Sequence, residues 1–460
     1  MVMSLPLPNA VSSRLPDGPA GHFLHGNTAE YMRGRLAFLE RMARTYGDVV
    51  LYRLGCDSTL LINDPALCRL VLGDWEHVDN ALTTGWLFLD QSYLAVQGRE
   101  RTRPRRIVHA SMCPERVLSR HAEMSQCVER LVENWQVGDV RDAMGDMMRV
   151  GVEMISEALL GRDVHSWAQG TFALLSDIQV LGGAYTTSPA VQERLTFARR
   201  QGVFEAMVQV VADLVRSLPP NPEDNAPAIG LLMRMRSEGS LTDMGLIHEV
   251  CVLLLSSGSS AILALNVLYV LSSYPEVREK LEAEMAAVLA GRAPVPAELP
   301  KLPYLELVLK ETLRLYPPVG LIPRQVVKDF ECGGYTIPAG SQIHMSPHLL
   351  HRHPAHWDDP ERFWPERFET SAVSRRALQD GAFLPFGSGI RRCIGDQLAS
   401  IQVKLLIATT LQRVRLDIAP GYVPAYDVSP MGACYPSSIE VPMVVTERHA
   451  RPELRRPEAP

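Results

Sequence analysis

The sequence lacks a basic excess, closely spaced cysteine pairs and an N-terminal apolar run. Its 46 Lys and Arg against 52 Asp and Glu give a formal net charge of -6, which argues against a nucleic-acid binder because few cations are left to neutralise phosphates. The eight cysteines form no Cys-x-x-Cys pair, so we predict reduced thiols in a cytoplasmic protein and no disulfide framework. The four prolines of Met1–Gly26 interrupt any signal peptide or membrane anchor.

One internal stretch, Val250–Leu271, is apolar enough and long enough to imitate a membrane span. It carries several serines and one asparagine near its centre and has no basic flank, so we predict a buried core helix. Hydrophobic residues at 46% and charged residues at 21% are typical of a soluble globular enzyme with a large core.

The stretch Phe386–Gly395 reads Phe-Gly-Ser-Gly-Ile-Arg-Arg-Cys-Ile-Gly, with glycines on both sides of Cys393. Glycine allows a tight turn and lets the backbone lie close to a planar ligand. Apolar residues then recur at helical spacing to about Val414, so we predict that Cys393 opens a helix. The helix N-terminus favours a thiolate, which is the form of cysteine that binds iron. The alternative is a buried cysteine in an ordinary glycine-rich turn.

This loop closely resembles the haem-binding loop of the cytochrome P-450 family, in its soluble bacterial type. The resemblance implies that Cys393 is the axial ligand of the iron in haem b, iron protoporphyrin IX. It also implies that Phe386, Gly387, Arg391 and Gly395 contact the cofactor. In such enzymes the thiolate pushes electron density onto the iron and favours O–O cleavage.

The resemblance covers at least Tyr31–Thr446 and implies a mainly α fold with a small β region. The haem is then expected between a long central helix and the helix that follows the cysteine loop. We expect a single catalytic domain over residues 31–446. A Pro-rich segment precedes it at residues 1–30, and the Arg-, Pro- and Glu-rich tail 447–460 is expected to be disordered.

Glu311 and Arg314 lie three residues apart, and Arg367 belongs to a later Pro-Glu-Arg-Phe run. A pair at this spacing is, by itself, typical of a surface salt bridge that contributes little. In the resembled family these three residues form one network, so we expect structural roles in haem retention. Breaking such a network is costly because a buried charge is left unpaired.

The densest cationic run of the chain is residues 98–106, which contain five arginines. A solvated helix face is the simple interpretation. The resemblance instead places two haem-propionate ligands at Arg101 and Arg105, although Arg101 departs from the usual aromatic residue or histidine. Arg324 and Arg391 resemble two further propionate ligands, and a guanidinium suits this role because it can donate two hydrogen bonds to one carboxylate.

Residues 243–271 predict a central helix of about 45 Å. In the family this helix carries an acid and a threonine that handle protons for dioxygen. Here the two positions hold Gly258 and Ser259, followed by Ser260, so the carboxylate is absent. Either Ser259 with water replaces it, or a polar group of the substrate supplies the protons. The hypothesis is an unusual oxidation, such as C–N or C–C bond formation; the alternative is a serine-rich packing site.

The substrate pocket is assigned from the order of segments in the family. A weakly patterned loop with Trp86, Leu87 and Phe88 corresponds to the one that covers the substrate, although simple packing of its aromatic residues is the alternative. The remaining pocket candidates come from the central helix, the segment after the Pro-rich turn and the C-terminal β region: Leu255, Val319, Leu321, Ile322 and Cys434.

The predicted function is that of a haem-thiolate oxidase that uses dioxygen to oxidise a medium-sized organic substrate, as a step of natural-product biosynthesis. Electrons are expected from a separate ferredoxin or flavoprotein. Oxidative coupling or ring formation without oxygen insertion is the alternative within this class. The alternative from another class is a non-enzymatic haem sensor or binding protein.

Overall fold

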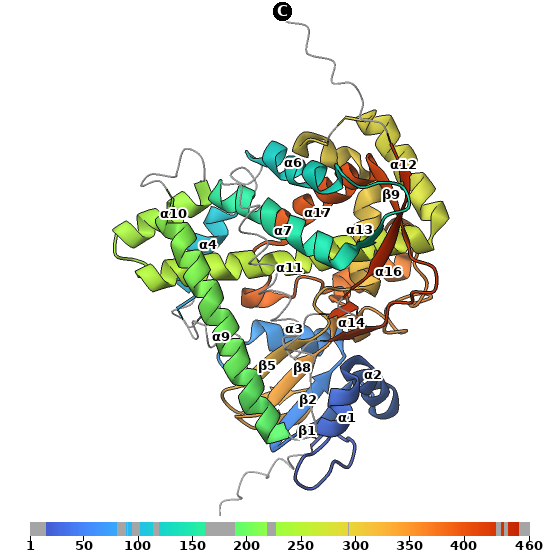
Figure 1. Ribbon diagram of the computed structural model, residues 1–460. Helices are drawn as coiled ribbons and strands as arrows, with labels where there is room; N and C mark the ends of the chain where they lie inside the picture. Colours follow the sequence, from blue (N-terminus) through green and yellow to red (C-terminus); the bar gives the residue numbers. More distant parts are fainter. Residues whose placement is uncertain are drawn as a thin grey trace, which may run out of the picture.

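The computed structural model describes residues 15–80, 89, 91–93, 102–113, 119–161, 189–218, 227–292, 294–428, 434–436 and 440–449. A large helical part lies beside a smaller β part, and α11 (Asp243–Ser273) runs through the middle of the helical part (Figure 1). The mainly α fold with a small β region is therefore confirmed. The helical part comprises α4 (Thr102–Ser111), α6 (His121–Val132), α7 (Ala143–Leu160), α9 (Pro189–Arg216), α10 (Pro227–Ser237), α11, α12 (Pro275–Leu289), α13 (Pro303–Leu315), α16 (Ala372–Asp380) and α17 (Asp396–Leu411).

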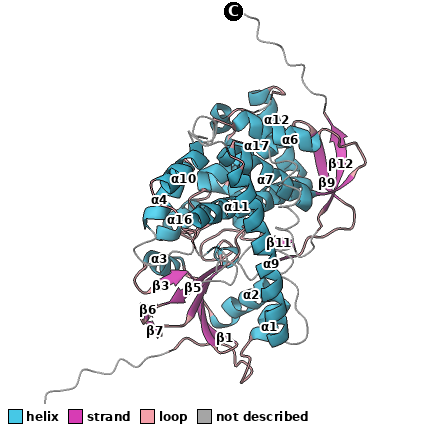
Figure 2. Ribbon diagram, turned by 60° about the vertical axis from the view of Figure 1, so that its left-hand side comes forward, coloured by secondary structure: helices cyan, strands magenta, loops and turns pink. Residues whose placement is uncertain are grey.

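Strands gather mainly at one end of the molecule (Figure 2). The five-stranded sheet has the order β1-β2-β8-β5-β3, formed by β1 (Val49–Leu54), β2 (Asp57–Ile62), β8 (Gln342–Met345), β5 (Ile322–Val326) and β3 (Val78–Asn80). Smaller sheets join β4 (Val140–Asp142), β12 (Pro442–Arg448) and β9 (Val414–Ile418); β6 (Phe330–Cys332) and β7 (Tyr335–Ile337); and β10 (Tyr426–Val428) and β11 (Cys434–Pro436). Strand β12 extends two residues past the expected domain end at 446.

The remaining helical elements are α1 (Thr28–Arg33), α2 (Arg35–Tyr46), α3 (Pro65–Gly73), α14 (Pro347–Leu350), α15 (Arg367–Thr370) and the 3-10 turns η4 (Pro296–Lys301) and η5 (Gly389–Arg391). Asp64 caps the start of α3, because its carboxylate accepts a hydrogen bond from the Leu67 N–H at 2.8 Å. This contact satisfies one of the N–H groups that a helix start leaves unpaired.

The central helix packs against α7, α17 and α13 in the largest apolar core. Gly151 of α7 faces α11, where a Cβ would make ordinary van der Waals contact with the Ala261 Cβ at 3.4 Å. Among the described helices, α11 alone is long and apolar enough to pass as a membrane span, and 83% of its most apolar window is buried in protein. That burial agrees with the expected core helix.

Candidate active site

The cysteine loop is shaped by two glycines in the left-handed region, Gly387 and Gly389, both with φ +68°. At Gly389 a Cβ would lie 2.1 Å from the Leu72 carbonyl oxygen, so only glycine fits against the end of α3. The Cys393 N–H donates to the Phe386 carbonyl at 2.9 Å and closes the loop. Helix α17 begins at Asp396, so the prediction that Cys393 opens the helix is wrong by three residues.

The Cys393 side chain is accessible to a ligand, yet enough protein surrounds it that burial raises the pKa of its thiol. A hydrogen bond from the Gly395 N–H and the positive charge of Arg105 oppose this effect. The loop alone therefore does not produce the thiolate expected from the helix terminus. Metal binding displaces the thiol proton, so the loop needs only to present the sulfur in the right place.

The predicted propionate ligands lie on separate elements around this loop. Arg105 of α4 donates to the Arg392 carbonyl within the loop, and Arg391 pairs with Asp79 of β3 at 3.2 Å. Strand β3 also pairs with β5, where Arg324 lies opposite Asn80. These contacts bring Arg105 and Arg391 to the cysteine loop, and the pairing of β5 with β3 places the backbone of Arg324 next to Asn80. Arg101 lies outside the described residues, and sequence reasoning missed Asp79.

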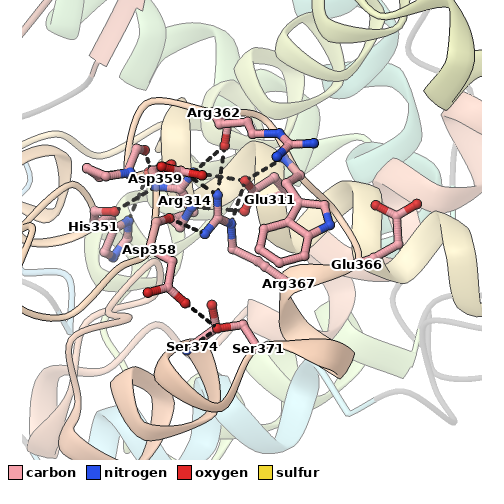
Figure 3. Close-up of polar contacts among 12 residues, drawn as sticks. Glu311, Arg314, His351, Asp358, Asp359, Arg362, Glu366, Arg367, Ser371 and Ser374 are labelled. Atoms are coloured by element: carbon pink, nitrogen blue, oxygen red, sulfur yellow. Dashed lines mark hydrogen bonds and ion pairs between the residues drawn. The ribbon is translucent and has the colours of Figure 1, made fainter.

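Glu311, Arg314 and Arg367 form one fully buried network (Figure 3). Arg314 donates two hydrogen bonds to the Glu311 carboxylate at 2.8 and 2.9 Å, and the Arg367 Nε donates to it at 2.9 Å. The Trp364 N–H also donates to this carboxylate, at 2.8 Å. Other N–H groups of the same two arginines donate to the backbone carbonyls of His351, Asp358, Asp359, Pro360 and Arg362. One carboxylate thus lies between two guanidinium cations, and backbone carbonyls accept the hydrogen bonds that the carboxylate does not.

His351 links this network to the cysteine loop, and sequence reasoning did not find it. Its carbonyl accepts from Arg314, and its Nε2 accepts from the Leu384 N–H at 2.8 Å. Burial lowers the pKa of His351 to about 3, so the ring is neutral and able to accept. The Leu384 carbonyl in turn accepts from the Gly387 N–H at 3.1 Å. The charge network therefore braces the segment from which the cysteine loop starts.

On the central helix, Gly258 and Ser260 are buried, whereas Ser259 is exposed to the space beside α11. Ser256, one turn earlier, is also exposed, although its hydroxyl donates to the Val252 carbonyl at 2.7 Å. The Ser259 hydroxyl therefore occupies the accessible face at the centre of the helix. The proposed proton-handling role of these residues stays a prediction.

The pocket candidates occupy different environments. Leu255, Val319 and Ile322 are partly exposed, as pocket residues would be. Leu321 and Cys434 are 3% and 1% exposed and belong to a core cluster beside the main sheet. Trp86, Leu87 and Phe88 lie outside the described residues.

A buried acid on the central helix, Glu249, also escaped sequence reasoning. It is 1% exposed, and its Oε1 accepts a hydrogen bond from the Tyr93 N–H at 2.6 Å. Burial raises the pKa of Glu249 to about 8, against the weaker opposing effect of that hydrogen bond. The sequence holds no local signal for this contact, because its partners are 156 residues apart.

Comparisons with known proteins agree with this geometry. The family model described as Cytochrome P-450 matches residues 16–441. Cyclooctat-9-en-7-ol 5-monooxygenase of Streptomyces melanosporofaciens is 30% identical over 414 residues, which cover 86% of this chain and 88% of the relative. Pentalenene oxygenase of Streptomyces avermitilis is 27% identical over 414 residues, covering 86% and 90%. Retinoic acid-bound cyanobacterial CYP120A1 superimposes with a TM-score of 0.81 at 22% identity, covering 94% of this chain and 99% of that one.

Proposed function

Since the chain belongs to the cytochrome P-450 family, with haem b as its cofactor, we propose that Cys393 binds the haem iron and that the enzyme oxidises a cyclic, largely apolar natural product. The observation that carries this proposal is the glycine-shaped loop that presents an accessible sulfur at Cys393. Dioxygen is the oxidant, and electrons come from a separate ferredoxin or flavoprotein. The proposed location is the cytoplasm.

The residues present fit this cofactor. Cys393 offers a soft sulfur ligand, and Arg105, Arg324 and Arg391 offer cations for the two haem carboxylates. Phe386 is partly buried against the main core and excludes water from the sulfur side. When bound, haem supplies the one-electron and dioxygen chemistry that amino-acid side chains lack.

The substrate class follows from the relatives and the candidate pocket. The two bacterial relatives are named for oxygenation of cyclooctat-9-en-7-ol and of pentalenene. In this chain the partly exposed Leu255, Val319 and Ile322 offer apolar contacts to a similar molecule. The leading reaction is therefore insertion of one oxygen atom into an apolar ring system. The curated monooxygenase relatives make a non-enzymatic haem sensor the weaker alternative.

Oxidation without oxygen insertion is a second candidate, favoured by one observation. Gly258 replaces the acid that handles protons in the family, and the exposed Ser259 hydroxyl is left at the centre of the helix. With no carboxylate at this point, the supply of protons depends on Ser259, on water or on the substrate. Oxygen insertion and coupling take up the same two external protons per dioxygen, so this candidate depends on a substrate whose own N–H or O–H group supplies a proton at this point.

One experiment tests both candidates: the purified enzyme is incubated with cyclic terpenoid substrates, a ferredoxin, its reductase and reduced nicotinamide, and product masses are measured. A gain of one oxygen supports monooxygenation, and a loss of two hydrogens supports coupling. The Cys393→Ala variant should form no product and should lose the carbon monoxide spectrum of thiolate-bound haem. A Cys393→Ala protein with an unchanged spectrum would refute the ligand assignment.

A further inference from the structure

Residues 91–93 are fastened to the first half of the central helix by three hydrogen bonds. The Thr242 hydroxyl donates to the Gln91 side-chain oxygen at 2.7 Å, and the Gln91 N–H donates to His248 Nδ1 at 3.3 Å. The Tyr93 N–H donates to Glu249 Oε1 at 2.6 Å, the shortest of the three. These contacts fix the backbone at Tyr93 relative to α11, and with it the position of the Tyr93 ring.

The Tyr93 side chain is 6% exposed and belongs to the main apolar core. Its phenol lies within electrostatic range of the Cys393 thiol, of Arg105 and of Arg391. The described residues offer its hydroxyl no hydrogen-bond partner. The hydroxyl is not one of the enclosed side-chain atoms that lack a partner, so it retains access to open space, where it is able to donate to a ligand that the protein itself does not supply.

We propose that the Tyr93 hydroxyl donates a hydrogen bond to a haem carboxylate beside Arg105 and Arg391, and that Glu249 is the positioning residue that holds Tyr93 there. This inference rests on the haem site proposed above. A phenol is a neutral donor, so it adds a contact to the carboxylate without adding charge to a region that already holds two guanidinium groups. The contact would also satisfy the unpaired hydroxyl.

The protonation state of Glu249 suits a holding role. Its raised pKa of about 8 keeps the acid mainly neutral at pH 7. A neutral carboxyl still accepts from the Tyr93 N–H through Oε1, but it places no negative charge near the haem carboxylates, which an ionised acid would repel. Within the described part of the chain, Oε2 has no hydrogen-bond partner. Glu249 thus acts on the cofactor through Tyr93.

Haem transfer from the ferric holoenzyme to excess apomyoglobin tests the Tyr93 contact. Tyr93→Phe removes only the hydroxyl and should speed haem transfer about tenfold, the effect of losing one hydrogen bond to a charged group. The matched control is Tyr31→Phe, because Tyr31 is 5% exposed and lies in a separate core cluster. The control should transfer haem at the wild-type rate. Equal rates for Tyr93→Phe and wild type would overturn the proposal.

Two variants test the role of Glu249. Glu249→Gln keeps a neutral acceptor and should retain haem as the wild type does, whereas Glu249→Leu should release it about tenfold faster. Combining Glu249→Leu with Tyr93→Phe should add little, because both changes remove the same contact. A hundredfold effect of the double variant would show that Glu249 acts independently of Tyr93. All variants should keep the carbon monoxide spectrum of thiolate-bound haem; its loss would refute the proposed iron ligand instead.

Discussion

Replacing Glu311 with glutamine removes the single negative charge between two buried guanidinium groups. The wild-type carboxylate accepts hydrogen bonds from Arg314, Arg367 and the Trp364 N–H, all at 2.8 to 2.9 Å. In Glu311→Gln, the amide nitrogen has to face a guanidinium donor, and two positive charges are left buried together. Breaking a buried ion pair in this way costs about 3–5 kcal/mol. That loss is a large part of the total stability of a typical protein, about 5–15 kcal/mol.

Urea unfolding followed by circular dichroism measures this loss, and the Soret absorbance of the same samples reports haem retention. Glu306→Gln is the matched control, because Glu306 lies on the same helix α13 and pairs with Lys404 at 2.6 Å while partly exposed. An exposed pair contributes about 0–1 kcal/mol, so the control should stay close to the wild type. If Glu311→Gln lost no more stability than Glu306→Gln, the network would not be holding the fold.

Two further changes are expected to have measurable effects. Gly389→Ala places a Cβ against the Leu72 carbonyl and should strongly reduce the haem-to-protein absorbance ratio. The control Gly334→Ala lies at φ +81° in open space, so it should lower the free energy of unfolding by only about 1–2 kcal/mol and keep the haem content of the wild type. Equal haem contents in the two variants would contradict this prediction. For Glu249 the folded-state pKa is raised, from 4.5 to about 8, so its contribution to stability is present at low pH and declines as pH rises through that interval. Between about pH 6 and pH 8, the free energy of unfolding measured by urea titration should therefore fall by about 2 kcal/mol more in the wild type than in Glu249→Gln. If the unfolding free energies of the two proteins changed in parallel with pH, this prediction would be wrong.

Local signals in the sequence predicted the main elements correctly. The apolar run predicted α11, and Thr242 caps the helix by accepting from the Gly245 N–H at 2.9 Å. The β1–β2 hairpin has local signals of the same kind, two apolar runs around a short turn, and its register joins Val49 to Ile62. Elements of this kind can be predicted because their physical causes lie within a few residues of one another.

Helical spacing of apolar residues runs through residues 31–46, yet the chain forms two helices there, because Gly34 adopts an extended conformation between α1 and α2. The apolar spacing continues across this break, so periodicity alone does not reveal it. Helix α17 likewise begins three residues later than the expected start at Cys393, because the apolar spacing does not show the turn that precedes it. Residues 389–391 form a 3-10 turn that directs the chain past the cysteine before the helix begins.

The residues that sequence reasoning missed are those whose partners are distant in the chain. His351 contacts Leu384, Asp79 pairs with Arg391, and Tyr93 binds Glu249. Nothing in the sequence around any of these residues specifies its partner, since each contact depends on how separate elements pack. The motif residues were found only because their spacing resembles that of a known family.

The two groups of buried polar residues are expected to respond differently to haem. Glu311 and its arginines have partners throughout the network, so they stabilise the fold whether or not the cofactor is bound. The Tyr93 hydroxyl lacks a partner among the described residues and gains one only from a bound carboxylate. Glu311→Gln should therefore lower the unfolding free energy of both haem-free and haem-bound protein, whereas Tyr93→Phe should lower only that of the haem-bound form. Haem that binds only the folded state adds its binding free energy to the stability of the protein. Urea unfolding of the haem-free and the haem-bound form of each variant therefore separates a loss of fold stability from a loss of haem affinity.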